Sequence, residues 1–122
     1  MSEDKQLVLS FSHTFWTNLT TEFSFNYPYT YERHEQYYNH VRKTFEGYAG
    51  EIVYDDQTLA VSRQGRPIRL ISITNNNQPA YNKPVILVTS RVHPSESPSS
   101  YVAEGIINFM VNQQDLRSHR IR

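Results

Sequence analysis

Hydrophobic and polar residues alternate in two short stretches near the start of the chain. In residues 6–12 and again in residues 22–27, apolar side chains occupy every second position. A period of two is typical of a half-buried strand. The mostly polar residues 17–21 join the two stretches, and Pro28 follows the second. The pattern therefore predicts a hairpin or meander over the first 28 residues.

Two further stretches have the spacing of helices. The first is predicted over residues 31–46, with Thr30 as its cap and its end near Gly47 and Gly50. Its apolar positions are Tyr38, Val41 and Phe45. The second begins at Ser97, predicted as the cap, with Pro98 at the first helical position. Its predicted buried face is Val102, Ile106, Phe109 and Met110. This second helix also has apolar residues outside that face, which predicts neighbours on more than one side.

Three more extended segments lie between the helices. Residues 52–63 and 67–74 flank Gln64-Gly65, a plausible tight turn. The apolar run Val85–Val88 follows Pro84 and is predicted to be a strand buried on both faces. The order of strands and helices argues for an α/β or α+β domain.

Composition excludes several classes of protein. The chain has 122 residues, and its 12 basic residues balance 12 acidic ones, which excludes the broad positive surface of a nucleic-acid-binding protein. With no cysteine, a metal site must use His, Asp and Glu. No apolar run approaches the ~20 residues of a membrane span, and the polar start MSEDKQ does not resemble a secretory signal. We expect a soluble intracellular protein that binds neither nucleic acid nor membrane.

The candidate chemistry lies between the last predicted strand and the last helix. His93 and Glu96 occur three residues apart around a tight turn, with Pro94 and Pro98 restricting the backbone. One imidazole and one carboxylate converging on a single point suit zinc. His-x-x-Glu spacing is also common by chance, so a solvated His and a helix-start Glu are the alternative.

Longer motifs resemble a known family. Residues 83–100 (KPVILVTSRVHPSESPSS) are similar to the zinc-site segment of the cytosolic carboxypeptidases, zinc enzymes of the carboxypeptidase A-like superfamily. Residues 27–31 (YPYTY) and 62–74 resemble the start and the hairpin of the family's catalytic domain. Residues 8–15 are similar to the last strand of the preceding β-sandwich domain. The resemblance covers nearly all of the chain.

The resemblance implies a fold and a domain division. Residues 1–27 would be the C-terminal strands of a β-sandwich. Residues 28–122 would be the N-terminal part, truncated, of a zinc carboxypeptidase domain. The implied fold class is α/β, the beginning of a carboxypeptidase A-like mixed-sheet domain.

The resemblance also assigns residues. His93 and Glu96 match the family's first two ligands of one Zn²⁺ ion. The third ligand, the groups that grip the substrate's carboxylate and the general base lie further along in the family, so no catalytic residue is assignable here. Ser95 replaces the family's glycine, at a cost if that position needs a positive φ.

The implied activity is removal of glutamates from tubulin-like tails, in the cytoplasm and in association with microtubules. Because the assigned set is incomplete, we expect this chain to be inactive alone. The alternative is a non-catalytic truncated isoform or an interaction module.

Other polar residues have structural and functional interpretations. Arg91 could hold an acidic substrate or pair with a carboxylate. The remaining histidines, His13, His34, His40 and His119, are expected in surface or capping roles. Arg63, Arg66 and Arg69 are expected to be solvated strand charges, the clustered tyrosines to pack between domains, and residues 117–122 to connect to a further strand.

Overall fold

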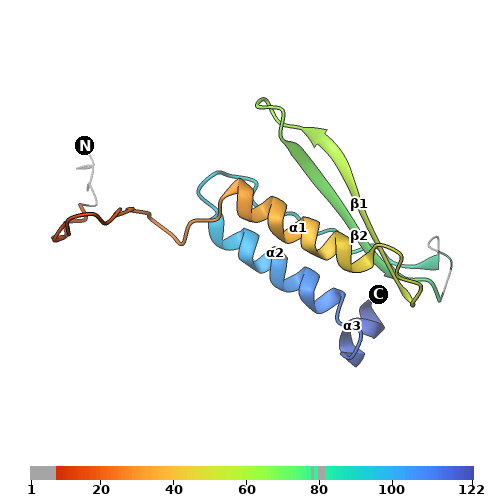
Figure 1. Ribbon diagram of the computed structural model, residues 1–122. Coiled ribbons are helices and arrows are strands. Elements are labelled where there is room, and N and C mark those ends of the chain that lie inside the picture. Colours follow the sequence, from red (N-terminus) through yellow and green to blue (C-terminus); the bar gives the residue numbers. More distant parts are fainter. Residues whose placement is uncertain (1–7, 78, 80–81) are drawn as a thin grey trace, which may run out of the picture.

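The computed structural model describes residues 8–77, 79 and 82–122. The elements in chain order are α1 (Tyr31–Phe45), β1 (Ile52–Val61), β2 (Pro67–Asn75), α2 (Ser97–Met110) and α3 (Leu116–Ile121). The helices α1 and α2 lie side by side and run in the same direction, and the hairpin β1–β2 extends past α1 (Figure 1). Within the described residues, no helix is both long and apolar enough to cross a bilayer. Helices with a two-stranded antiparallel sheet fit the start of an α/β domain.

The first helix forms as its sequence predicts. The Thr30 hydroxyl accepts a hydrogen bond from the Arg33 N–H at 3.1 Å, which satisfies one of the unpaired donors at the helix start. The helix ends at Phe45, and Gly47 follows with a φ of +73°. Glycine reaches this left-handed region without a steric penalty, so it lets the chain turn away.

The hairpin also follows its pattern. β1 and β2 are antiparallel from the Ile52–Asn75 pair to the Val61–Pro67 pair, with an irregularity between Thr58 and Ala60. At the tip, the Gly65 N–H donates to the Ser62 carbonyl at 2.9 Å. Gly65 has a φ of +74°, as the predicted turn requires.

Gly65→Ala is expected to destabilise the chain by about 1–2 kcal/mol, because a Cβ in the left-handed region meets the following carbonyl. Gly105→Ala in α2 is the matched control, since the added Cβ would find open space and alanine is the better helix former. The urea midpoint should therefore fall in Gly65→Ala and rise in Gly105→Ala. Equal shifts would show that the turn does not need its glycine.

A small core joins the two long helices to the sheet. Tyr38 and Val41 of α1 and Ile107 of α2 are its buried members. Beside them the Phe45 and Tyr54 rings stack at 5.3 Å with an interplanar angle of 20°. The core therefore combines aromatic rings with aliphatic side chains such as Val41 and Ile107.

An ion-pair cluster lies beside this core. The Arg69 guanidinium donates to the Glu35 carboxylate at 2.7 and 3.2 Å and to Asp56 at 2.7 Å. It also lies 5.9 Å from the centroid of the Tyr38 ring. The Arg69 side chain is only 12% exposed, so the expectation of a solvated strand charge is wrong for this residue. Arg69 sits on the β2 face that α1 covers, a fact that spacing within one strand does not reveal.

The opening segment differs from its prediction. Residues 8–27 contain no strand, although the rings of Phe11 and Phe23 approach to 5.2 Å. The Leu19 N–H donates to the Trp16 carbonyl at 3.4 Å, so the two stretches do fold toward each other. A lone two-stranded hairpin is marginal without further strands or a covering helix. Residues 6 and 7 of the first predicted strand lie outside the described part.

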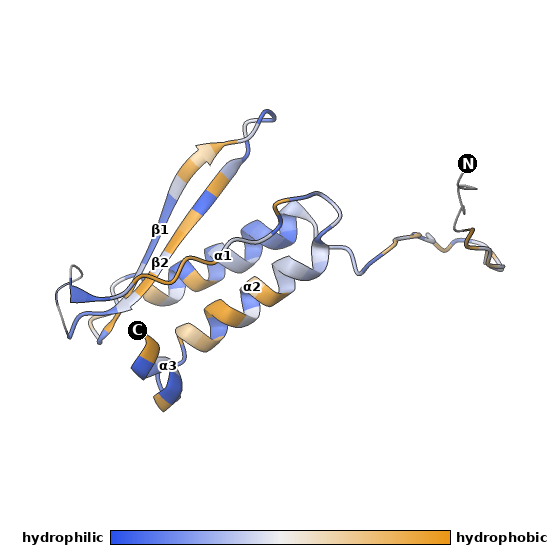
Figure 2. Cartoon of the chain, turned by 180° about the vertical axis from the view of Figure 1, so that it is seen from behind, coloured by the Kyte–Doolittle hydropathy of each residue, from blue (hydrophilic) through white to orange (hydrophobic). Residues whose placement is uncertain are grey.

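The Val85–Val88 segment is likewise not the buried strand that was expected. It is extended but pairs with no strand in the described residues, and its side chains are 53–89% exposed. Figure 2 shows this apolar stretch on the connection between β2 and α2. A strand is defined by hydrogen bonds to a neighbour, and an apolar run cannot supply that neighbour by itself.

The buried face of α2 differs from the prediction in part, since Phe109 and Met110 are partly buried but the other two predicted positions are exposed. Val102 is 61% and Ile106 is 37% exposed, whereas Glu104 is 7% and Ile107 is 8% exposed. Arg33 of α1 and Tyr29, which precedes α1, bind the Glu104 carboxylate. These contacts bury the face of α2 that carries Glu104. The helix begins with Ser97 as its first residue, and Glu96 precedes it without capping it by a side-chain hydrogen bond.

The last residues form a short helix, α3, and their expected connection to a further strand stays a prediction. Asp115 caps α3 by accepting from the Arg117 N–H at 2.9 Å. The buried Arg122 guanidinium donates to Asn75 Oδ1 at 2.8 Å and to Ser118 Oγ at 2.9 Å. Asn75 ends β2, so this polar cluster ties α3 to the sheet. Asn75 lies 47 residues before Arg122 in the chain, and the residue types alone do not reveal this contact.

Candidate metal centre

His93 and Glu96 lie in one tight turn between the extended apolar segment and α2. The Glu96 N–H donates to the His93 carbonyl at 3.2 Å, which closes the turn. The His93 N–H donates back to a Glu96 carboxylate oxygen at 3.3 Å. The carboxylate is therefore folded over the turn that carries the imidazole.

Both side chains are accessible for binding. His93 is exposed and Glu96 is partly buried. Among the described residues, no ion pair or side-chain hydrogen bond occupies the His93 ring, and the Glu96 carboxylate has no cationic partner. Pro94 within the turn restricts φ to one region, which limits how far the two groups can separate. The turn thus offers one nitrogen and one oxygen ligand from a stiff backbone.

This donor set is chemically suitable for zinc but incomplete. Zinc takes imidazole nitrogen and carboxylate oxygen, and catalytic sites use three protein ligands plus water. In the described parts of the chain, no group of three His, Asp or Glu side chains is placed to hold a metal ion. The described residues therefore provide two candidate ligands for the zinc ion expected from the sequence.

Three of the other histidines, His13, His34 and His119, have contacts elsewhere in the chain. His119 Nε2 lies 3.3 Å from the Glu51 carboxylate, and His13 Nε2 lies 3.3 Å from the Thr21 hydroxyl. His40 is exposed on α1. His34 is partly buried against tyrosine rings, 4.4 Å from the Tyr38 centroid, and this burial lowers its pKa. A packing role for His34 is therefore added to the surface and capping roles that were expected.

The substitution of the family glycine by Ser95 brings no backbone strain. The described non-glycine residues with positive φ are Asn18 at +66° and Arg91 at +55°. Ser95 is not among them, so the conditional cost at this position does not arise. The left-handed residue of the loop is Arg91, which the sequence did not single out for its backbone.

The sequence left two roles open for Arg91, a contact with an acidic substrate or a pair with a carboxylate. Its Nε donates to the Pro94 carbonyl at 3.1 Å. Its Nη1 lies 3.4 Å from both the Tyr29 carbonyl and the Ser100 hydroxyl. No carboxylate of the described residues pairs with it. The substrate contact stays a prediction.

Glu104 of α2 is the centre of a hydrogen-bond cluster that includes Tyr29, a residue that also contacts Arg91. It accepts hydrogen bonds from the Tyr29 hydroxyl at 2.8 Å and from Arg33 Nη2 at 2.9 Å. The Tyr37 hydroxyl donates to the Glu104 carbonyl at 3.0 Å. The tyrosines thus pack and bond between two helices of this chain. Sequence reasoning missed Glu104, because a carboxylate inside an apolar helix gives no periodic signal.

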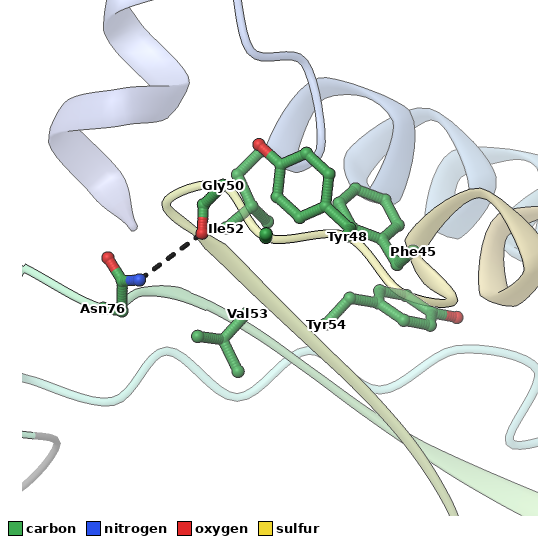
Figure 3. A pocket seen from close by; sticks show the side chains of 8 residues that line it. Phe45, Tyr48, Gly50, Ile52, Val53, Tyr54 and Asn76 are labelled. Carbon is green, nitrogen blue, oxygen red and sulfur yellow. Dashed lines mark hydrogen bonds between the residues drawn. The ribbon is translucent and has the colours of Figure 1, made fainter.

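Among the open hollows of the described residues, two are of similar size. One of about 360 Å³ lies between residues 24–30 and the loop at 91–97. The other, of about 320 Å³, is at the junction of α1 and β1 (Figure 3). Tyr48 covers Gly50 there, and Asn76 Nδ2 donates to the Gly50 carbonyl at 3.4 Å. Only the first hollow adjoins the His93–Glu96 turn.

Comparison with known proteins identifies the class. The zinc carboxypeptidase family matches residues 53–122, which include the turn and α2. The chain belongs to this family. Among its relatives, cytosolic carboxypeptidase 6 of Mus musculus is 36% identical over 124 residues, covering 96% of this chain and 22% of that protein. Cytosolic carboxypeptidase-like protein 5 of Danio rerio is 28% identical over 152 residues, covering 98% and 17%. No solved structure matches.

These matches also bear on the subfamily and on length. The opening motifs favour cytosolic carboxypeptidase-like protein 5 within the family, and relatives of that name are matched. Relatives named cytosolic carboxypeptidase 6 are matched at higher identity. The chain spans about a fifth of the length of these curated relatives.

Proposed function

We propose that this chain forms the first part of the metal centre of a cytosolic metallocarboxypeptidase that removes glutamates from polyglutamylated tails such as those of tubulin. The names of the relatives support the enzyme class and the cytosol. The glutamate substrate and an association with microtubules rest on the family resemblance of residues 83–100.

One observation carries the proposal. The Glu96 carboxylate folds back to within 3.3 Å of the His93 N–H, so both ligand types belong to one turn. His93 would supply an uncharged imidazole nitrogen and Glu96 a carboxylate oxygen. Together with a third ligand, these two side chains would hold a Zn²⁺ ion that supplies polarisation of a carbonyl and a lowered pKa of a bound water. The two prolines near the turn keep its backbone prepared for the ion.

The chain alone is proposed to be inactive. Neither a third ligand nor a general base is assigned among the described residues, and a zinc hydrolase needs both. A non-catalytic interaction module is the second candidate. The exposed apolar side chains of Val85–Val88 and of Val102 favour it, because such surfaces often mark contacts with other protein elements.

Zinc titration tests the metal centre. We expect the chain to bind one Zn²⁺ with a dissociation constant weaker than about 1 μM, since that value corresponds to about 8 kcal/mol and complete structural sites reach about 10–16 kcal/mol. His93→Ala should abolish this binding. His119→Ala is the matched control and should leave it unchanged. Tight binding that depends on His119 would contradict the assignment.

An activity assay tests whether the chain alone is inactive. Incubated with zinc and a glutamylated peptide, the chain should release no glutamate above the background of a heat-denatured sample. Release that disappears in His93→Ala would show that a complete site exists in these 122 residues. Release that persists in that variant would indicate a contaminating peptidase.

A further inference from the structure

Arg91 has a backbone conformation that side chains rarely adopt. Its φ is +55°, in the left-handed region that disfavours any residue with a Cβ. Such a conformation persists where surrounding contacts hold it, and these positions gather at functional sites. Arg91 lies two residues before His93, where the extended apolar segment bends into the turn.

The contacts that hold Arg91 span the turn. Its backbone N–H donates to the Ser99 hydroxyl at 2.9 Å, in the first turn of α2. Its Nε donates to the Pro94 carbonyl at 3.1 Å. One residue therefore binds both the middle of the turn and the helix that follows it.

The guanidinium also reaches outside the loop. Nη1 donates to the Tyr29 carbonyl at 3.4 Å. Tyr29 is 8% exposed, and its hydroxyl is bound to Glu104 at 2.8 Å. The loop is thus connected through Arg91 and Tyr29 to Glu104 of α2, which also binds Arg33 of α1.

We propose that Arg91 is a positioning residue that holds the His93–Glu96 turn in its metal-binding geometry. This rests on the proposed function, since His93 and Glu96 are its metal ligands. Groups that orient the ligands of a metal are worth about 10–100-fold in metal affinity. The planar guanidinium directs donors to several carbonyls at once, which the point charge of a lysine does not do.

Zinc titration and amide hydrogen exchange of the whole chain, the latter without metal, test this role. Arg91→Lys and Arg91→Ala should each weaken zinc binding by about tenfold or more. The amides of His93 and Glu96 should exchange faster in both variants, while the urea midpoint of the chain stays within error. Arg63→Ala, at the exposed hairpin tip, is the control and should change none of these readouts.

The outcomes separate the two proposals. Unchanged exchange at the turn in both Arg91 variants overturns the positioning role. If zinc binds normally to Arg91→Ala and the turn is unchanged, a substrate contact would account for Arg91, and the positioning role fails. If His93-dependent zinc binding is absent from the unsubstituted chain while both Arg91 variants still loosen the turn, the metal assignment fails and positioning of the turn by Arg91 is upheld.

Discussion

His93→Ala should lower kcat/KM by at least about 10³-fold when residues 8–122 replace the matching segment of the mouse cytosolic carboxypeptidase 6. A zinc ion contributes several kcal/mol to catalysis, and each 1.36 kcal/mol is tenfold in rate. The match covers 96% of this chain but only 22% of the relative. The rest of the relative would therefore supply the groups that are not assigned here. Release of glutamate from a glutamylated peptide measures the effect.

Two further variants of the chimera serve as comparisons for His93→Ala. Glu96→Gln keeps the shape of the side chain but removes the anionic ligand. The kcat/KM of the chimera should therefore fall nearly as far as in His93→Ala. His40→Ala, on the exposed face of α1, should keep the activity of the unsubstituted chimera. A chimera that folds and retains activity after His93→Ala would remove His93 from the metal centre.

Arg69→Met should destabilise the chain by about 3–5 kcal/mol, because removing one member of a buried ion pair leaves the others uncompensated. The Asp56 side chain is 2% exposed, so water cannot replace the guanidinium there. Native domains have only about 5–15 kcal/mol in all, so the variant should unfold at a markedly lower urea concentration than the unsubstituted chain. Urea unfolding followed by circular dichroism measures the change.

Two controls accompany Arg69→Met. Arg117→Ala breaks the Arg117–Asp115 ion pair, whose arginine side chain is 80% exposed, and should change stability little because exposed pairs contribute little. The triple variant Glu35→Gln, Asp56→Asn, Arg69→Met removes all the charges and should regain part of the loss. An Arg69→Met protein as stable as the unsubstituted chain would show that water reaches the cluster.

The pKa of Glu35 gives the same cluster a pH dependence. Hydrogen bonds from Arg69 hold the pKa of this carboxyl below its usual value of 4.5. A group with a depressed folded-state pKa contributes stability above its unfolded pKa and loses it as pH falls through the folded value. Stability should therefore drop below pH 4.5, and the drop should be smaller in Glu35→Gln. A drop of equal size in that variant would assign the acid sensitivity to other carboxyls.

Local features of the chain were accessible from the sequence. Thr30, Gly65 and the period of residues 31–46 predict one cap, one turn and one helix, because each depends on neighbours within a few positions. The His93-x-x-Glu96 spacing with its prolines likewise brings the candidate ligands into one turn. Residues 83–100 also pointed to the family that the comparison with known proteins shows.

Other features depend on segments far apart in the chain. Glu104 is buried because Tyr29 and Arg33 reach it from about 70 residues away, and hydrophobic spacing favours the opposite face of α2. Val85–Val88 reads as a buried strand, yet burial and pairing require a neighbour that no local pattern provides. The sequence by itself determined α1, α2, the hairpin β1–β2 and the turn that carries the two candidate ligands. Only the tertiary structure decided which faces are covered and that Arg91 bends the loop, because those outcomes depend on partners that spacing does not specify.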